Sequence, residues 1–283
     1  MTVGVVVALA AVLLTSAPVR AAAPAFRFQD FPRGLGESLA AHTGTAYDRA
    51  AAWFGTDLEG PVIVRWVSRR EDLQRLGVRN PDSVAGVARS DSGLIALYAP
   101  ALGPRPERIR GVILHEICHL FVAKITRHAE LEPPRWLNEG IAMWVSGEWD
   151  LGLELRSDHA SLMQDAIAAS AIVPMEELDT GFPEGRFFHV AYAQSLSFVE
   201  WMVRQQGEDS LLSYLRQLDQ DLDPEPAFRR IYGMSFRDAE LAWRDELLNA
   251  PLSGLPSART VLEFLWVLVA LLMILKFVQV RLR

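Results

Sequence analysis

The chain has 283 residues, half of them hydrophobic, which is enough for one domain with a sizeable core. Its formal net charge of −7 excludes a general nucleic-acid-binding surface, because such a surface requires an excess of basic residues. The single cysteine, Cys118, excludes a disulfide framework within the chain. We therefore expect one globular domain with no disulfide bond and no nucleic-acid partner.

Apolar segments lie near both ends of the chain. Residues 3–14 are apolar and small residues follow them, which is typical of a secretory signal peptide. Residues 261–280 have about the length that crosses a bilayer, and basic residues follow them, which favours a cytoplasmic end. The predicted divisions are a signal peptide or N-terminal anchor (1–23), a globular domain (24–250), a linker (251–259), a transmembrane helix (260–280) and a cytoplasmic tail (281–283). The expected location is the cell membrane, as a single-pass protein whose globular domain faces the periplasm or the cell exterior.

The first half of the globular domain predicts a small sheet among helices. Apolar residues recur at helical spacing over residues 37–54, and three short apolar runs, 62–67, 84–87 and 94–98, are typical of strands. Residues 107–125 predict a long helix that is apolar nearly all round, as expected of a centrally buried helix.

The second half predicts helices throughout. Helical periodicity covers five further segments, namely 157–170, 189–206, 210–218, 226–232 and 236–248. The expected fold class is α+β, with a small antiparallel or mixed sheet and a helical C-terminal half.

Residues 115–119 read His-Glu-Ile-Cys-His inside the long predicted helix. Residues four apart share one face of a helix, so His115 and His119 can reach the same zinc ion. Glu116 is directed towards the same cleft, where its carboxylate can accept a proton from metal-activated water. This spacing predicts a zinc-dependent hydrolase.

A catalytic zinc ion needs a third protein ligand, and Glu139 is the candidate. It lies in residues 136–142, which read Trp-Leu-Asn-Glu-Gly-Ile-Ala, 20 positions after His119. That step leaves room to end one helix, turn at the two prolines 133–134 and begin an antiparallel helix. Three competing ligands fit less well because they lie in the connecting segment: His128, Glu130 and Glu132. The alternative for Glu139 is an ordinary surface carboxylate.

The segments 115–119 and 136–142 together resemble the gluzincin metallopeptidases. Over about residues 35–248 the chain resembles the peptidase MA-like group of mainly bacterial proteins. The resemblance implies a zincin-type helical core and a peptide or protein substrate. It also implies an edge strand that holds extended peptide, for which residues 94–98 are the candidate, with an internal strand as the alternative.

The same resemblance implies one zinc ion per chain, bound by His115, His119 and Glu139, with Glu116 as the general base. It departs from the thermolysin-type pattern at Met143, where those enzymes carry an acidic residue that orients a ligand histidine. Another residue must therefore orient the histidine in this chain.

Peptide hydrolysis also needs a hydrogen-bond donor for the developing oxyanion. Tyr192 occupies a position at which many gluzincins carry a tyrosine for this task. His189, three residues earlier on the same predicted helical face, is a second candidate. Either side chain could instead belong to the core, with its polar tip hydrogen-bonded.

The combined prediction is a membrane-anchored, zinc-dependent peptidase. The alternative is a non-catalytic peptide-binding module that retains the zincin fold, and a third hypothesis is a membrane-tethered scaffold with an accidental motif. The sequence leaves open the cleaved bond, the choice between endopeptidase and exopeptidase, and the oligomeric state.

Overall fold

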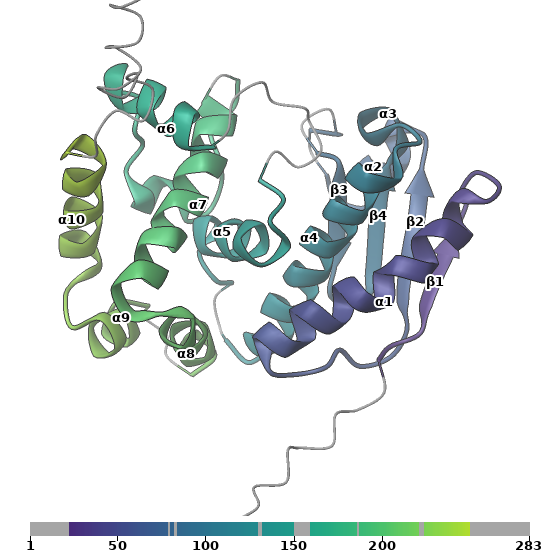
Figure 1. Ribbon diagram of the computed structural model, residues 1–283, viewed down its shortest axis with the longest axis horizontal. Coiled ribbons are helices and arrows are strands. Elements are labelled where there is room, and N and C mark those ends of the chain that lie inside the picture. The colour runs from purple at the N-terminus through teal and green to yellow at the C-terminus, as the bar shows by residue number, and fades with distance from the viewer. Residues whose placement is uncertain are drawn as a thin grey trace, which may run out of the picture.

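The computed structural model places a small sheet on one side of the molecule and a bundle of helices on the other (Figure 1). It describes residues 23–78, 80–81, 84–129, 132–149, 159–185, 187–220 and 224–249. The first half contains β1 (Phe26–Gln29), α1 (Leu35–Phe54), β2 (Val62–Val67), α2 (Arg70–Arg75), β3 (Gly86–Arg89), β4 (Leu94–Tyr98), α3 (Ala99–Leu102) and α4 (Pro106–Ile125). The second half contains α5 (Arg135–Ser146), α6 (His159–Ala168), the 3-10 helix η2 (Met175–Leu178), α7 (Phe187–Gln206), α8 (Glu208–Leu218), α9 (Pro224–Tyr232) and α10 (Phe236–Asn249). The predicted α+β class with a helical C-terminal half is confirmed.

The sheet is mixed, with the strand order β1-β2-β4-β3. The pairs β1–β2 and β2–β4 are parallel, whereas β3 runs antiparallel to β4. All five residues of β4 are buried, since this strand has a neighbour on each side. The prediction that residues 94–98 form the open edge is therefore wrong, and β3 is the edge strand on this side.

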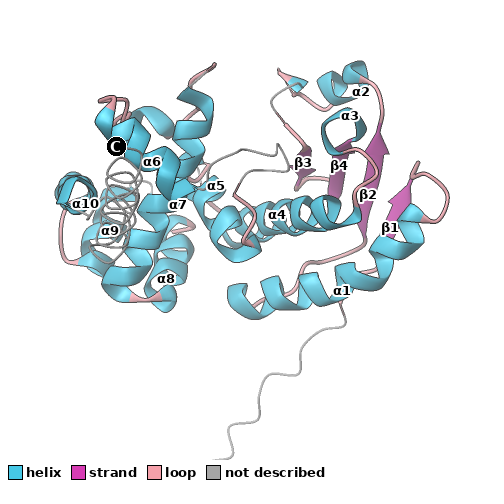
Figure 2. Ribbon diagram, turned by 45° about the horizontal axis from the view of Figure 1, so that its top comes forward, coloured by secondary structure: helices cyan, strands magenta, loops and turns pink. Residues whose placement is uncertain are grey.

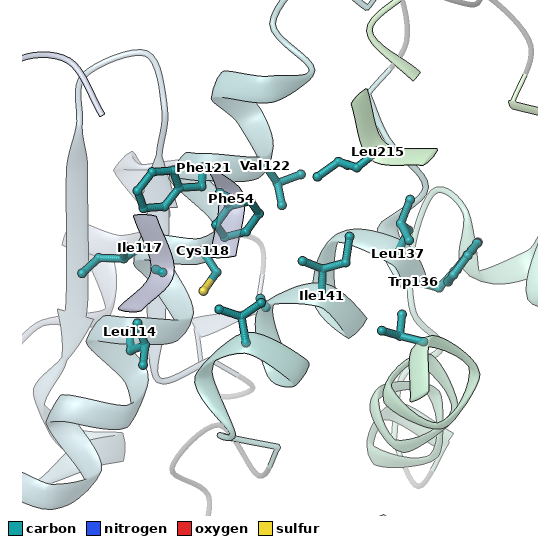
Figure 3. Close-up of a cluster of buried hydrophobic side chains, with 14 of the residues drawn as sticks. Phe54, Leu114, Ile117, Cys118, Phe121, Val122, Trp136, Leu137, Ile141 and Leu215 are labelled. Carbon is teal, nitrogen blue, oxygen red and sulfur yellow. The ribbon is translucent and has the colours of Figure 1, made fainter. Parts of the chain in front are cut away.

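Two long helices, α1 and α4, lie across the same face of the sheet (Figure 2). The α4 helix also contacts α5 and α8, so it separates the sheet from the C-terminal helices. Its side chains meet Phe54 of α1 on one side and Ile141 of α5 on the other (Figure 3). Cys118 is fully buried in this core, in agreement with its apolar surroundings. An apolar surface on both sides explains why α4 is apolar nearly all round.

The α5 helix packs closely against α7 because Gly140 has no side chain. A Cβ atom at Gly140 would lie 2.6 Å from Val199 Cγ2 and 2.7 Å from the Ser195 carbonyl oxygen. Both distances are shorter than carbon contacts allow, so the glycine sets the spacing of these two helices.

The predicted membrane-spanning helix is corrected. Among the residues that the structure describes, no helix is long and apolar enough to cross a membrane. Even the buried α4 carries Arg108, Arg110 and Glu116, charges that a lipid-facing span excludes. The predicted segments 1–23 (apart from residue 23), 251–259, 260–280 and 281–283 lie outside the described residues. The single-pass membrane location is therefore not retained.

Replacing Gly140 should destabilise the fold. We expect Gly140→Ala to lower the free energy of unfolding by about 1–3 kcal/mol, because the added methyl group overpacks the α5–α7 contact. The control is Gly44→Ala in α1, where a Cβ atom meets nothing within 4 Å. That variant should be neutral or more stable by up to about 1 kcal/mol. Urea unfolding of both variants measures the difference, and a Gly140→Ala protein as stable as wild type would contradict the packing argument.

Candidate metal centre

Three side chains from two helices converge at the centre of the molecule. His115 and His119 lie on consecutive turns of α4, and their Nε2 atoms are 3.1 Å apart. The Oε2 atom of Glu139, in the second turn of α5, is 3.4 Å from His115 Nε2 and 3.5 Å from His119 Nε2. The three predicted metal ligands therefore lie together. In the described part of the chain, no other group of His, Cys, Asp and Glu side chains is placed to hold a metal ion.

The spacing of these three atoms fits a zinc ion. Ligand atoms about 2.0–2.2 Å from a tetrahedral zinc ion are separated from one another by roughly 3.3–3.6 Å. The observed separations of 3.1, 3.4 and 3.5 Å are close to this range. Two imidazole nitrogens and one carboxylate oxygen are also the donor types that zinc accepts, and three ligands leave a fourth position open. The donor types and their spacing thus fit a zinc ion.

Asn138 orients one of the two histidines. His119 Nδ1–H donates to Asn138 Oδ1 over 2.8 Å, so the Nε2 atom of this ring keeps its lone pair for a cation. Asn138 is thus the orienting residue that the sequence did not identify, at a position directly before Glu139. Met143, at the position of the missing acidic residue, is buried against Tyr192 and Leu196.

Electrostatics keeps Glu139 ionised. Burial alone would raise the pKa of Glu139, but the two histidines hold it well below its usual range. Burial would likewise lower the pKa of His119, whereas Glu139, Glu116 and Asn138 together raise it to about 9. The buried ring of His115 has a lowered pKa, chiefly through its burial. A cation at the centre, either a proton or a metal ion, is therefore favourable.

The carboxylate of Glu116, a residue of α4, lies between that helix and the edge strand β3. Its side chain is 5% exposed, and burial raises its pKa to about 7. The carboxylate accepts a hydrogen bond from the Ala88 backbone N–H. A Cβ atom at Gly86 would lie 2.7 Å from Glu116 Oε1, so this glycine leaves room for the carboxylate beside the strand. Glu116 is thus placed between the three metal-binding atoms and the open edge of β3.

The comparison with known families agrees with this geometry. A family model described as the Peptidase MA superfamily matches residues 43–249. The chain belongs to the Peptidase MA superfamily. No curated protein and no solved structure matches it. Membership indicates a peptidase-type hydrolase with a zincin-like fold, and proteins of this superfamily are usually zinc-dependent. The resemblance found in the sequence is confirmed at this level.

The metal-binding group of this Peptidase MA protein opens into a cleft of about 1040 Å³. One wall is the edge strand β3, and the other is formed by the first turns of α5 together with Tyr192 of α7. The hydroxyl group of Tyr192 donates a hydrogen bond to Glu139 Oε1 over 3.4 Å, whereas Glu139 Oε2 faces the two histidines.

The remaining candidate site residues from the sequence differ in whether they line the cleft. His189 is half-buried beside Phe188 and is not among the side chains that line the cleft. His128 lies outside the cleft, and its backbone N–H donates to Asp219. Glu132 lines the cleft but is not part of the metal-binding group, and Glu130 lies outside the described residues.

Metal analysis tests this arrangement directly. We expect about one zinc ion per wild-type chain and none bound stoichiometrically by His115→Ala, because a zinc site of this type needs all three protein ligands. Asn138→Ala should keep the site but weaken zinc affinity by about 10–100-fold, since His119 would lose its orienting partner.

Competition with a chromophoric chelator measures these affinities. His128→Ala is the matched control, because it removes an imidazole outside the cleft, and it should bind zinc like the wild type. Wild-type zinc affinity in Asn138→Ala would contradict the orienting role.

Proposed function

We propose that this protein is a zinc-dependent peptidase of the gluzincin type, with Glu116 as the general base. The observation that carries the proposal is the convergence of the His115, His119 and Glu139 donor atoms beside Glu116 in an open cleft. A zinc ion bound there would polarise the peptide carbonyl and make water a stronger nucleophile. Side chains and backbone groups of the chain itself would transfer the proton, bind the substrate backbone and stabilise the oxyanion.

Glu116 moves the proton. Its carboxylate accepts the proton of the attacking water and then delivers it to the nitrogen of the leaving amine. Two features support this role, namely the position of the carboxylate next to the metal-binding group and the hydrogen bond from Ala88 N–H that fixes it. Burial raises the pKa of Glu116 above that of an ordinary carboxyl group, which makes the carboxylate a stronger proton acceptor.

The edge strand β3 is proposed to hold the substrate backbone. The Ala85 carbonyl accepts a hydrogen bond from Tyr98 N–H and so faces β4. Because backbone groups alternate along an antiparallel strand, those of Gly86 and Ala88 face away from β4, towards the cleft. The Ala88 N–H donates to Glu116, which leaves the backbone groups of Gly86 and the Ala88 carbonyl for a substrate. An extended peptide can pair with this open edge through main-chain hydrogen bonds. Such pairing would place a peptide bond beside Glu116.

Tyr192 is proposed to stabilise the oxyanion. Its ring is packed against Phe182 and Phe188, and its hydroxyl group lines the cleft beside Glu139. Burial raises the pKa of Tyr192 far above its ordinary value, so the hydroxyl group stays protonated. Its hydrogen, donated to Glu139 in the structure, would turn to the oxyanion when substrate is bound. His189 does not line the cleft, and we assign it no part in the reaction.

The first test is the substitution Glu116→Gln. It should retain one zinc ion per chain but lower kcat by about 10²–10⁴-fold, because the amide cannot accept the proton. Cleavage of a fluorogenic peptide library, with zinc content measured on the same samples, gives both results. Glu132→Gln makes the same chemical change in the same cleft and should leave kcat unchanged. Full activity in Glu116→Gln would sink the mechanism, and an inactive, zinc-loaded wild type would favour a peptide-binding module.

The second test is Tyr192→Phe. Removing one oxyanion donor should lower kcat by about 10²–10³-fold with little change in KM, since the hydroxyl group acts mainly in the transition state. Steady-state kinetics at full zinc loading separates the two constants. A rise in KM at constant kcat would instead assign Tyr192 to ground-state binding.

A further inference from the structure

Arg135 places a positive charge in the cleft, one helical turn before Glu139. It is the first residue of α5, it lines the cleft, and its side chain is 39% exposed. Neither the metal-binding group nor the proposed proton transfer uses this side chain.

Packing and hydrogen bonds fix the position of Arg135. The guanidinium carbon lies 4.7 Å from the centroid of the Phe182 ring, within the range of a cation–π contact. The backbone N–H of Arg135 donates to the Asp179 carbonyl oxygen over 2.7 Å. The next residue, Trp136, donates its indole N–H to the Asp179 carboxylate over 3.0 Å. The first turn of α5 is thus held from two directions, and the guanidinium group has a defined place in the cleft wall.

Among the described residues, the guanidinium group of Arg135 has more N–H donors than polar partners. It carries five N–H groups and stays charged at any physiological pH. Among the described residues its polar partners are Glu139, whose Oε1 lies 3.7 Å from Arg135 Nε, and the hydroxyl group of Tyr192. The other oxygen of Glu139 faces the two histidines. These two contacts leave N–H groups of Arg135 that have no polar partner in the described part of the chain.

The charges around Arg135 favour an anionic partner at this one point. Two other acidic side chains of the cleft, Glu116 and Glu132, would repel a carboxylate elsewhere. The Asp179 carboxylate beside the first turn of α5 already accepts the indole N–H of Trp136. The other cleft arginine, Arg127, is 57% exposed and lies 3.9 Å from Glu59. A planar guanidinium group with free N–H groups matches a carboxylate with two parallel hydrogen bonds.

We propose that Arg135 is a specificity-determining residue that binds a carboxylate of the peptide substrate next to the cleaved bond. The inference rests on the proposed peptidase function of the same cleft. Arg135 Nε lies 3.7 Å from a carboxylate oxygen of Glu139, one of the three metal-binding residues. A carboxylate bound by Arg135 is therefore held close to the metal-binding group and to the bond cleaved there. It is either the C-terminal carboxylate of a single departing residue or the side chain of an adjacent Asp or Glu.

A binding experiment in the zinc-loaded Glu116→Gln protein tests this without requiring turnover. The probes are a short neutral peptide with a free C-terminal carboxylate, its C-terminal amide, and amidated peptides that differ only by Glu or Gln at one position. Binding is measured by calorimetry. The carboxylate member of one pair should bind about 10–100-fold more tightly than its neutral counterpart, as expected for a charge-assisted hydrogen bond.

The variants assign that preference to Arg135. Adding Arg135→Leu should abolish it, whereas Arg135→Lys should retain part of it as a point charge. Arg127→Leu removes a cation from the same cleft and should leave the preference unchanged. Zinc content is measured for every variant, because Arg135 also contacts Glu139.

The outcomes separate the two carboxylate sources and the two proposals. A preference in the acid–amide pair supports C-terminal recognition, and one in the Glu–Gln pair supports side-chain recognition. Absence of any preference in the parent protein, or its persistence in Arg135→Leu, would overturn the inference. If wild type fails to cleave these peptides while the Arg135-dependent preference remains, the peptidase function fails and the carboxylate site stands.

Discussion

The close packing of α5 against α4 and α7 is the constraint on which the whole site depends. The histidines come from α4, Glu139 from α5 and Tyr192 from α7, so no single helix contains the site. The apolar contacts of Cys118 and Ile141 hold α4 and α5 together (Figure 3). Metal sites tolerate errors of only about 0.5 Å in the placement of their ligands. A well-packed core under the ligands is therefore part of the metal site.

The same packing buries ionisable groups, and the loss of their hydration lowers the stability of the fold. Glu116, Glu139 and the two histidines line the same cleft, and all are largely buried. A buried cluster of this kind contributes little to stability, because the loss of hydration offsets the attraction between its charges. Shifted pKa values of buried groups in a cleft are instead typical of functional sites. The core around α4 and α5 offsets the cost.

The sequence predicted the metal-binding group because its geometry is local. The spacing of His115 and His119 follows from one helical turn, and the step to Glu139 needs only a turn between two helices. Asn138 could not be identified in the same way, since no spacing rule distinguishes it from an ordinary polar residue beside Glu139. Its role depends on the relative rotation of α4 and α5, which only the folded chain defines.

The order of the strands in the sheet could not be predicted from the sequence, for a similar reason. The apolar run of β4 is the same whether that strand lies at an edge or inside a sheet, because periodicity reports burial and not neighbours. The true edge, β3, is short and begins with Gly86, a residue that weakens a strand pattern. In the fold this glycine gives Glu116 its space. The strand itself was predicted, at residues 84–87 and so two residues early, but the sequence did not show that it forms the edge.

The two walls of the cleft suggest a division of tasks in substrate recognition. The β3 wall offers backbone N–H and C=O groups, which bind extended peptides largely without regard to their side chains. The opposite wall carries Arg135, Asn138, Glu139 and Tyr192 from α5 and α7. In the proposed peptidase, selection on the charge of a peptide would arise on this second wall, because it carries Arg135 and the ionised Glu139. Arg135 is held by Phe182 and lies next to Glu139. The residue that would select a charged substrate and a residue that would bind the metal therefore lie one turn apart on α5. A substrate that satisfied Arg135 would thereby be placed with its neighbouring peptide bond at Glu116.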